Sequence, residues 1–225
     1  MSQQEQFLAD MAHEDHHLAV LVAQVGAAPN ELQLMVEVAR LDEAAGGLRR
    51  IRNYIIRVLG VLEHRIVNFG TTVNQVALVD DHPLLYEYVE RPTAVFFKGA
   101  VANPDGITLD IAQAHATTFA HWRRFPEYLN VQQPLQTLFA SGGGLIGQMP
   151  ESLAEQIVKV LDHHGLEHKT AHGTPYIQVH DNPALVQQKP QVLTLGASYF
   201  VAYAFAFDEM KGRQKPPMPA PDDDN

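Results

Sequence analysis

Three residues near the N-terminus have the spacing of a zinc-binding helix. His13, Glu14 and His17 form an H-E-x-x-H pattern. In zinc hydrolases with this pattern, the two histidines share one helix face and hold Zn²⁺, while the glutamate activates the metal-bound water. A metal-dependent hydrolase is therefore one hypothesis for this chain.

The surrounding residues argue against that hypothesis. Residues 3–25 have apolar side chains at helical spacing, and Glu14 falls on this apolar side. No third histidine stands six residues beyond His17, where the chain has Ala23. We predict that Glu14 is a packed residue paired with Arg49 or Arg52 and that the pattern binds no metal.

Other histidines gather between residues 163 and 180. The reversed pattern H-x-x-E-H occurs as His164, Glu167 and His168, but Gly165 interrupts it at an expected helix end. We interpret the group as solvated loop histidines, although the sequence leaves open whether it binds a metal or titrates as a group below about pH 6.5. Its members are His163, His164, His168, His172 and His180.

A glycine-rich stretch, "SGGGLIG" at 141–147, contains a G-x-G-x-x-G pattern. Such a turn binds dinucleotides when it joins a strand directly to a helix, whose N-terminus then faces the pyrophosphate. Here "QMPE" separates the glycines from the expected helix, and no repeated strand-helix-strand pattern surrounds them. We interpret residues 142–147 as a mobile loop, and a nucleotide-dependent enzyme that uses them is the alternative.

Five of the 16 basic residues lie close together, as Arg49, Arg50, Arg52, Arg57 and Arg65. They could contact an acidic partner, but the net charge of −10 disfavours nucleic acid or an anionic membrane as the main ligand. The chain contains no cysteine, so disulfides, thiolate metal sites and cysteine nucleophiles are excluded. We predict no catalytic residue, no metal and no cofactor.

The elements that would position these residues appear helical in the first third of the chain. Apolar residues between 31 and 69 recur at alternating spacings of four and three, which predicts a long helix. Two adjacent glycines, Gly46 and Gly47, favour a bend or a break within it. Residues 1–70 are therefore expected to form a long helical hairpin or a three-helix unit.

The remainder shows a different period. Residues 91–101 and 107–111 flank the turn sequence "ANPDG" and predict one β-hairpin, and residues 166–170 and 175–179 predict a second. Residues 150–165 predict a helix capped by Ser152 and Glu155. Residues 192–207 are ambiguous between strand and helix, and we favour a buried helix because of the length of the run, its alanines and the Lys211-Gly212 that follows. The run is too short to span a membrane.

Together these elements predict an α+β fold. Its parts are the helical unit 1–70, a compact domain of two β-hairpins covered by helices at 71–212, and a Pro-rich acidic tail at 213–225. No secretory signal is recognised, and the cytoplasm is the expected location.

The function expected from this fold is that of an accessory or assembly subunit in a larger cytoplasmic protein complex, without enzymatic activity. Folded back in a hairpin, residues 3–25 are too short to cover the far end of the longer helix. An apolar stripe there needs a partner, either the chain's own second domain or other protein subunits, including a second copy in an oligomer. The predicted interface consists of Ile55, Leu59, Leu62 and Ile66.

Overall fold

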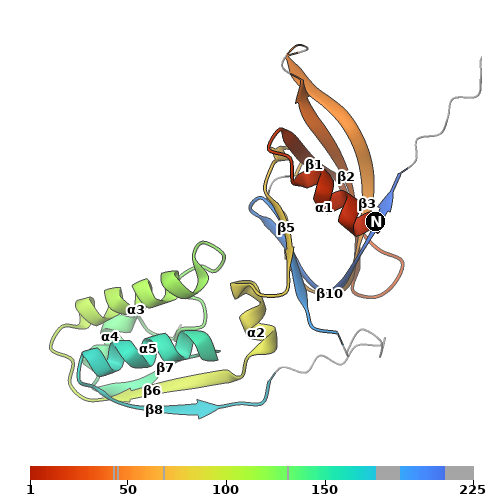
Figure 1. Cartoon of the computed structure of the whole chain (residues 1–225). Helices are drawn as coiled ribbons and strands as arrows, with labels where there is room; N and C mark the ends of the chain where they lie inside the picture. The colour runs from red at the N-terminus through yellow and green to blue at the C-terminus, as the bar shows by residue number, and fades with distance from the viewer. Residues whose placement is uncertain (43, 45, 68, 131, 176–187, 211–225) are drawn as a thin grey trace, which may run out of the picture.

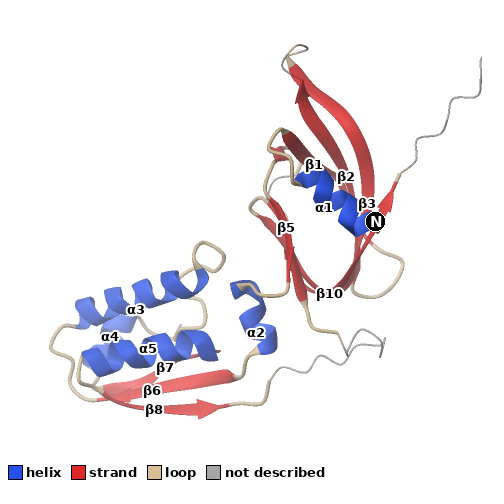
Figure 2. Cartoon of the chain, viewed as in Figure 1, coloured by secondary structure: helices blue, strands red, loops and turns tan. Residues whose placement is uncertain are grey.

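The computed structural model describes residues 1–42, 44, 46–67, 69–130, 132–175 and 188–210. Within these residues the chain forms a seven-stranded and a three-stranded antiparallel sheet, each with helices against one face (Figures 1 and 2). The fold is mainly β, so the predicted α+β fold with an N-terminal long helical hairpin is wrong.

The seven-stranded sheet, which we call sheet A, has the strand order β4-β1-β2-β3-β10-β9-β5. Strands β9 and β10 come from the C-terminal part of the described chain, and β10 pairs with β3 while β2 pairs with its other edge. The strands are β1 His16–Val25, β2 Glu31–Asp42, β3 Gly47–Arg65, β4 Thr72–Val73, β5 Val76–Val79, β9 Gln191–Leu195 and β10 Ser198–Glu209.

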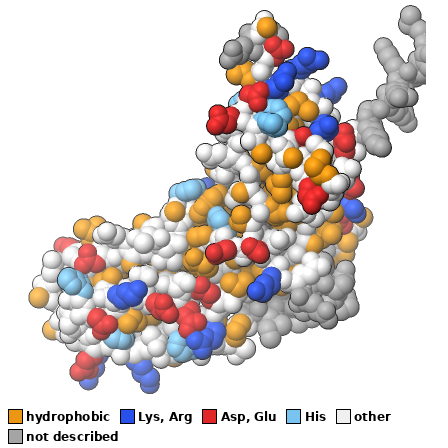
Figure 3. Space-filling view, viewed as in Figure 1, with side chains coloured by type: hydrophobic (Ala, Val, Ile, Leu, Met, Phe, Trp, Pro, Cys, Tyr) orange, Lys and Arg blue, Asp and Glu red, His pale blue; other side chains and the backbone are white. Residues whose placement is uncertain are grey.

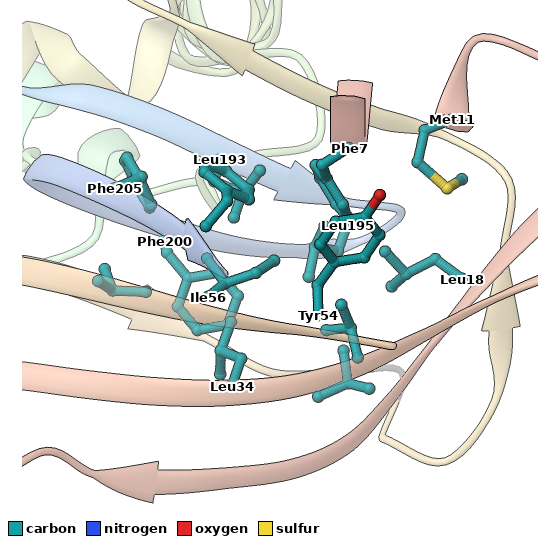
Figure 4. Close-up of a cluster of buried hydrophobic side chains, with 14 of the residues drawn as sticks. Phe7, Met11, Leu18, Leu34, Tyr54, Ile56, Leu193, Leu195, Phe200 and Phe205 are labelled. Carbon is teal, nitrogen blue, oxygen red and sulfur yellow. The ribbon is translucent and has the colours of Figure 1, made fainter. Parts of the chain in front are cut away.

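Helix α1, Gln3–Met11, lies in the concave side of this curled sheet (Figure 1). It begins with a capping box, in which the Glu5 amide donates to the Ser2 hydroxyl at 3.1 Å and the Ser2 amide donates to the Glu5 carboxylate at 2.7 Å. Phe7 is fully buried, and its ring centroid lies 5.2 Å from that of Tyr54 and 4.9 Å from that of Phe207 (Figure 4). Burying such a ring contributes about 2–3 kcal/mol to the free energy of folding. Helix α1 is therefore held on sheet A mainly by the side that carries Phe7.

The predicted helices over 3–25 and 31–69 are corrected by these strands. Helix α1 ends at Met11, and residues 31–65 form the β2–β3 hairpin, whose turn contains Gly46 with a φ of 65°. The bend or break expected within a helix at Gly46 and Gly47 is instead the reversal of a β-hairpin, because a left-handed glycine reverses a hairpin as readily as it ends a helix.

The three-stranded sheet, sheet B, has the order β7-β6-β8. Its strands are β6 Pro92–Lys98, β7 Gly143–Pro150 and β8 Glu167–His172, and its helices are α3 Pro104–Phe119, α4 Leu135–Ala140 and α5 Glu151–His163. Since β7 and β8 are both antiparallel to β6, they run parallel to one another with α5 as their connection, which is a split β-α-β arrangement.

Some predictions for this part of the chain are confirmed. The helix at 150–165 is α5, ended by Gly165 with a φ of 66°, and the strands expected at 91–101 and 166–170 correspond to β6 and β8. The partner strand at 175–179 and the tail at 213–225 lie largely or wholly outside the described residues.

Two predictions for this part are wrong. Residues 107–111 belong to α3, because Asn103 caps that helix by accepting the Gly106 amide at 2.9 Å and Pro104 occupies its first turn. Residues 192–207 form the β9–β10 hairpin, not a helix, and Gly196 starts its two-residue turn with a φ of 59°.

A short segment between β5 and β6 connects the two sheets and packs against sheet A. It contains the 3₁₀ turn η1 Pro83–Leu85 and helix α2 Tyr86–Val89. Leu84 and Leu85 are buried against Tyr199 and Val201 of β10, with Trp122 at the edge of the same cluster. This contact covers one end of the convex face of sheet A.

Candidate functional site

The predicted zinc residues do not share a helix. His13 and Glu14 lie in the turn after α1, and His17 belongs to β1. Glu14 is exposed, so the expectation that it is buried and paired with an arginine is wrong. No group of three potential ligands among the described residues could hold a metal ion. The geometry on which the hydrolase hypothesis depends is absent at these residues.

The glycine-rich stretch is a strand, not a loop before a helix. Gly143–Pro150 forms β7, and a Cβ added to Gly147 would lie 2.2 Å from the backbone carbonyl oxygen of Tyr128. This glycine therefore allows the loop at 128–130 to pack directly on the strand.

The N-terminus of the helix that follows is also occupied. The Ser152 amide of α5 donates to a carboxylate oxygen of Glu90 at 2.8 Å, and the Ser152 hydroxyl donates to the other oxygen. Glu90 thus takes the place of the predicted Ser152–Glu155 cap and fills the position where a phosphate would bind. The contacts of these described residues give no support to nucleotide binding at 142–147.

The histidines between 163 and 172 are held individually by different neighbours. His164 Nε2 lies 2.7 Å from Asp110, His168 Nδ1 lies 3.4 Å from Asp162, and His172 Nδ1 lies 3.0 Å from the Thr93 hydroxyl. These contacts spread the side chains over α3, α5 and β6, and only His168 and His172 among the described members line a common pocket, which lies between β8 and α5. His180 lies outside the described residues.

The buried acid of the N-terminal region is Asp10, which the sequence patterns did not single out. Asp10 is 7% exposed, and its carboxylate accepts two hydrogen bonds of 2.8 Å from Arg52 and one of 2.6 Å from the Tyr54 hydroxyl. Burial by itself raises the pKa of Asp10, but the hydrogen bonds from Tyr54, Arg52 and Gln6 outweigh burial and hold the pKa below its usual value. The pairing ties α1 to β3.

A second buried network connects the two sheets. The guanidinium of Arg123, in the loop after α3, donates to both oxygens of Glu63 on β3 at 2.6 Å each. The Tyr88 hydroxyl donates to the same carboxylate at 3.0 Å, and that of Tyr199 at 2.5 Å. Because four donors fill the two oxygens, Glu63 has no free lone pair with which to act as a base.

The charge state of this network follows from its contacts. Burial tends to raise the pKa of Glu63, but Arg123 and the two tyrosines keep it below its ordinary value. Burial and the nearby Glu63 carboxylate raise the pKa of Tyr199 to about 12. The site is therefore an ionised pair with neutral phenols at neutral pH, suited to joining β3, β10 and α2 rather than to proton transfer. An acidic residue inside the apolar run of β3 was the signal available in the sequence.

The predicted cluster of arginines is divided between the faces of the β2–β3 hairpin. Arg52 is inside, paired with Asp10, and Arg57 is outside, 3.4 Å from Asp208. Arg49 and Arg50 are exposed. Figure 3 shows basic side chains gathered near the end of this hairpin. Acidic and basic groups are mixed over the second lobe, which consists of sheet B and its helices.

The convex face of sheet A carries an apolar surface beside the end that η1 covers. Alternate residues of β2 and β3 face the core, so the residues between them point outward. Met35 pairs with Ile55 across the two strands, and Leu59 lies on the same side of β3. None of these three belongs to a cluster of buried residues. We call this surface the outer strip, formed by Val22, Met35, Ile55, Leu59, Ala204 and Ala206.

The four residues of the predicted interface are not on one face. Ile55, Leu59 and Leu62 lie on the convex side of sheet A, where Leu62 packs against the η1 cluster, whereas Ile66 packs against the core around α1. A β-bulge at Leu62, where Val201 and Ala202 meet Glu63 and Val61, interrupts the alternation of β3 before Ile66.

Comparisons with protein-family models, with curated proteins and with solved structures found no match. None of the helices in the described part of the chain has the length and apolar content needed to cross a membrane. Function must therefore be inferred from the surface of the molecule itself.

Proposed function

We propose that the protein is an accessory or assembly subunit, without enzymatic activity, that binds another protein chain through the outer strip. The observation that carries this proposal is that Met35, Ile55 and Leu59, each half-buried, adjoin one another on the convex face of sheet A but pack into no buried cluster. Contiguous apolar surface that a folded chain leaves partly uncovered is typical of protein interfaces.

The polar residues beside the strip indicate the chemistry of the partner. Glu31 and Glu37 point outward from β2, Arg50 and Arg57 from β3, and Asp208 from β10, where it lies 3.4 Å from Arg57. A surface with an apolar centre and both signs of charge fits a folded protein better than nucleic acid, which favours a basic surplus. The net charge of −10 supports the same choice.

The proposal keeps the cytoplasm as the place of action. The absence of cysteine from the whole sequence agrees with a reducing compartment, since no part of the fold depends on a disulfide. Other protein subunits, including a second copy, are the partners that it names.

In-cell photo-crosslinking at position 55 tests the proposal. A photoreactive residue in place of Ile55 should give a protein adduct, because this side chain lies in the outer strip. The control is the same residue in place of Leu109, which is 69% exposed on α3 and far from the strip in sequence and in fold. No adduct at position 55, or equal adducts at both positions, would refute binding through this surface.

A further inference from the structure

We propose that the free edge of strand β8 binds an extended peptide segment of another protein, which adds to sheet B as a fourth strand and ends in a free carboxylate. This site goes beyond the proposed function, which concerns the outer strip of sheet A. It is inferred from the main-chain groups at the edge of β8, from the groove beside them and from the charges along that groove.

The two edges of sheet B differ in how they are covered. At β7 the Asn130 amide donates to the Ile146 carbonyl oxygen at 2.6 Å, and its side-chain amide donates to that of Leu145 at 3.0 Å. Strand β8, at the other edge (Figure 1), pairs with β6 alone among the described strands. An uncovered strand edge accepts a further strand, whose main-chain hydrogen bonds contribute the affinity.

The strand register shows which groups of β8 face this edge. The Gly173 amide donates to the Pro92 carbonyl oxygen at 2.7 Å, so these two residues form a hydrogen-bonded pair of the antiparallel ladder. Every second residue from there, namely His172, Thr170 and His168, turns its main chain away from β6. Each of them therefore offers one donor and one acceptor to an added strand.

The side chains of the same three residues line a groove of about 450 Å³ between β8 and α5. Ala154 and Val158 of α5 form its apolar part. Residues directly opposite on antiparallel strands share a face, so alternate side chains of an added strand enter this groove. They recur about every 6.6 Å, close to the rise of about 6 Å between helix residues four apart, such as Glu151, Glu155 and Lys159.

Two charges along the groove indicate the chemistry of the segment. Glu155 and Lys159 are exposed and form no ion pair within the described part of the chain. Glu151, by contrast, is already paired with Arg91. A basic side chain opposite Glu155 and a carboxylate opposite Lys159 complement both of the unpaired charges.

The order of these charges selects the direction of the segment. Helix α5 runs opposite to β8, so Lys159 lies toward the start of that strand near His168, and Glu151 lies toward its end near His172. A segment antiparallel to β8 therefore ends beside Lys159, where its terminal carboxylate meets the ammonium group. His168 already has Asp162 as a neighbour at 3.4 Å. A parallel segment would bring its positively charged N-terminus to Lys159 instead.

A designed hexapeptide is the probe. It carries threonine at its first, third and fifth positions, valine at its second and sixth, lysine at its fourth, and a fluorescent label at its N-terminus. Fluorescence anisotropy should show saturable binding to the full chain with a Kd on the order of 100 μM. The same peptide with a C-terminal amide, or with glutamate at its fourth position, should bind about 10-fold more weakly.

Three variants test the placement of the peptide. Thr170→Pro removes an amide that faces the free edge, and it should abolish binding without loss of a hydrogen bond to β6. Glu155→Lys should weaken binding of the lysine peptide about 10-fold and restore binding of the glutamate peptide. Lys169→Glu is the control, because Lys169 pairs with Phe96 on the other face of the sheet, and it should bind as the wild type does. Circular dichroism will establish that each variant is folded.

The outcomes are decisive in either direction. No saturation by the wild-type chain at peptide concentrations up to about 1 mM overturns the inference. Equal binding of the carboxylate and amide peptides, or a Glu155→Lys variant without altered peptide preference, does so as well. A wild-type dimer in sedimentation that Thr170→Pro abolishes would assign the edge to a second copy and would also overturn it. Crosslinking at position 55 tests the outer strip separately, so either proposal can fail alone.

Discussion

Each of the two sheets has a covered and an uncovered face, and the uncovered faces differ in their polar residues. On sheet B, Phe96 and Leu145 are 39% and 37% exposed, and both belong to no buried cluster. Lys98 of β6 stands opposite Glu167 of β8 in the strand register of that sheet. On sheet A the outward charges run acid, base, acid over β2, β3 and β10, and Arg57 lies 3.4 Å from Asp208.

Exposed apolar area therefore does not by itself identify an interface. Both faces expose apolar side chains, and a single exposed phenylalanine is ordinary on a monomer. Only on sheet A do the outward apolar residues extend over four neighbouring strands, β1, β2, β3 and β10. Substitutions on the covered faces, at the connection between the sheets and on the uncovered faces should therefore differ in their effect on the free energy of unfolding.

The largest effect is expected on the covered face of sheet A. Phe7→Ala removes a fully buried ring between Tyr54 and Phe207 and should lower the free energy of unfolding by about 3–5 kcal/mol. Phe96→Ala, on the uncovered face of sheet B, should cost less than about 1 kcal/mol. Urea unfolding of both variants measures the difference, and equal losses would contradict the assignment of the two faces.

The next largest loss of stability is expected at the connection between the sheets. Glu63→Gln removes the carboxylate that faces Arg123, although Glu87 and Glu127 remain 3.6 and 3.4 Å from that guanidinium. The expected loss is about 2–3 kcal/mol, below the full cost of breaking a buried pair. Calorimetry should also show the single unfolding transition separating into two, because the network joins the two lobes.

Glu151→Gln is the matched control for that experiment. Glu151 pairs with Arg91 at an exposed position, where water screens the interaction. Its unfolding transition should stay single and unshifted. A single, unshifted transition in Glu63→Gln as well would show that the hydrophobic contacts of η1 alone hold the lobes together.

A smaller loss is expected where backbone packs on backbone in the second lobe. Gly147→Ala places a methyl group 2.2 Å from the Tyr128 carbonyl oxygen and should cost about 2 kcal/mol, since the loop must move. Gly47→Ala, which meets nothing within 4 Å, should change stability by about 0.5 kcal/mol or less. Thermal unfolding of the pair is the measurement, and a harmless Gly147→Ala would refute the close packing of residues 128–130 on β7.

The smallest effect concerns pH. The pKa values of Asp10 and Glu63 are lower in the folded chain than their ordinary values of 3.8 and 4.5. The unfolded chain therefore binds more protons in acid, and the stabilisation is present above about pH 4.5 and lost as the pH falls through the folded-state values. Glu63→Gln should flatten this acid-side slope in chemical unfolding measured from pH 6 downward. An unchanged slope would show that Glu63 has its ordinary pKa.

The sequence predicted some elements well because their signals are local. Helix α5 has apolar residues on one face and a glycine directly after its last turn, so that its own residues specify both its period and its end. Gly46 and Gly47 were recognised as a break for the same reason. Asn103 and Pro104 were misread because the residues that form a turn also begin a helix.

The β2–β3 hairpin was misread as a helix because both of its faces carry apolar residues. Leu34 and Val38 face the core, and these alone fit a strand as well as a helix. Ile55 and Leu59, on the outward face, supplied the additional positions that completed a helical period. The outward apolar residues that form the outer strip are thus the same residues that hid the alternating pattern of the strands. The sequence pattern alone does not show which of two apolar faces packs inside this chain and which could meet another chain.

The sequence by itself determined the helix α5, the strand β6, the breaks at glycine and the absence of cysteine chemistry, since each depends on residues within a few positions of one another. Only the tertiary structure decided which charges are buried. Asp10 meets Arg52, and Glu63 meets Arg123, across 42 and 60 residues of chain. Such pairs form because the curled sheet buries distant segments together away from water. A charged side chain is tolerated there only when an opposite charge neutralises it.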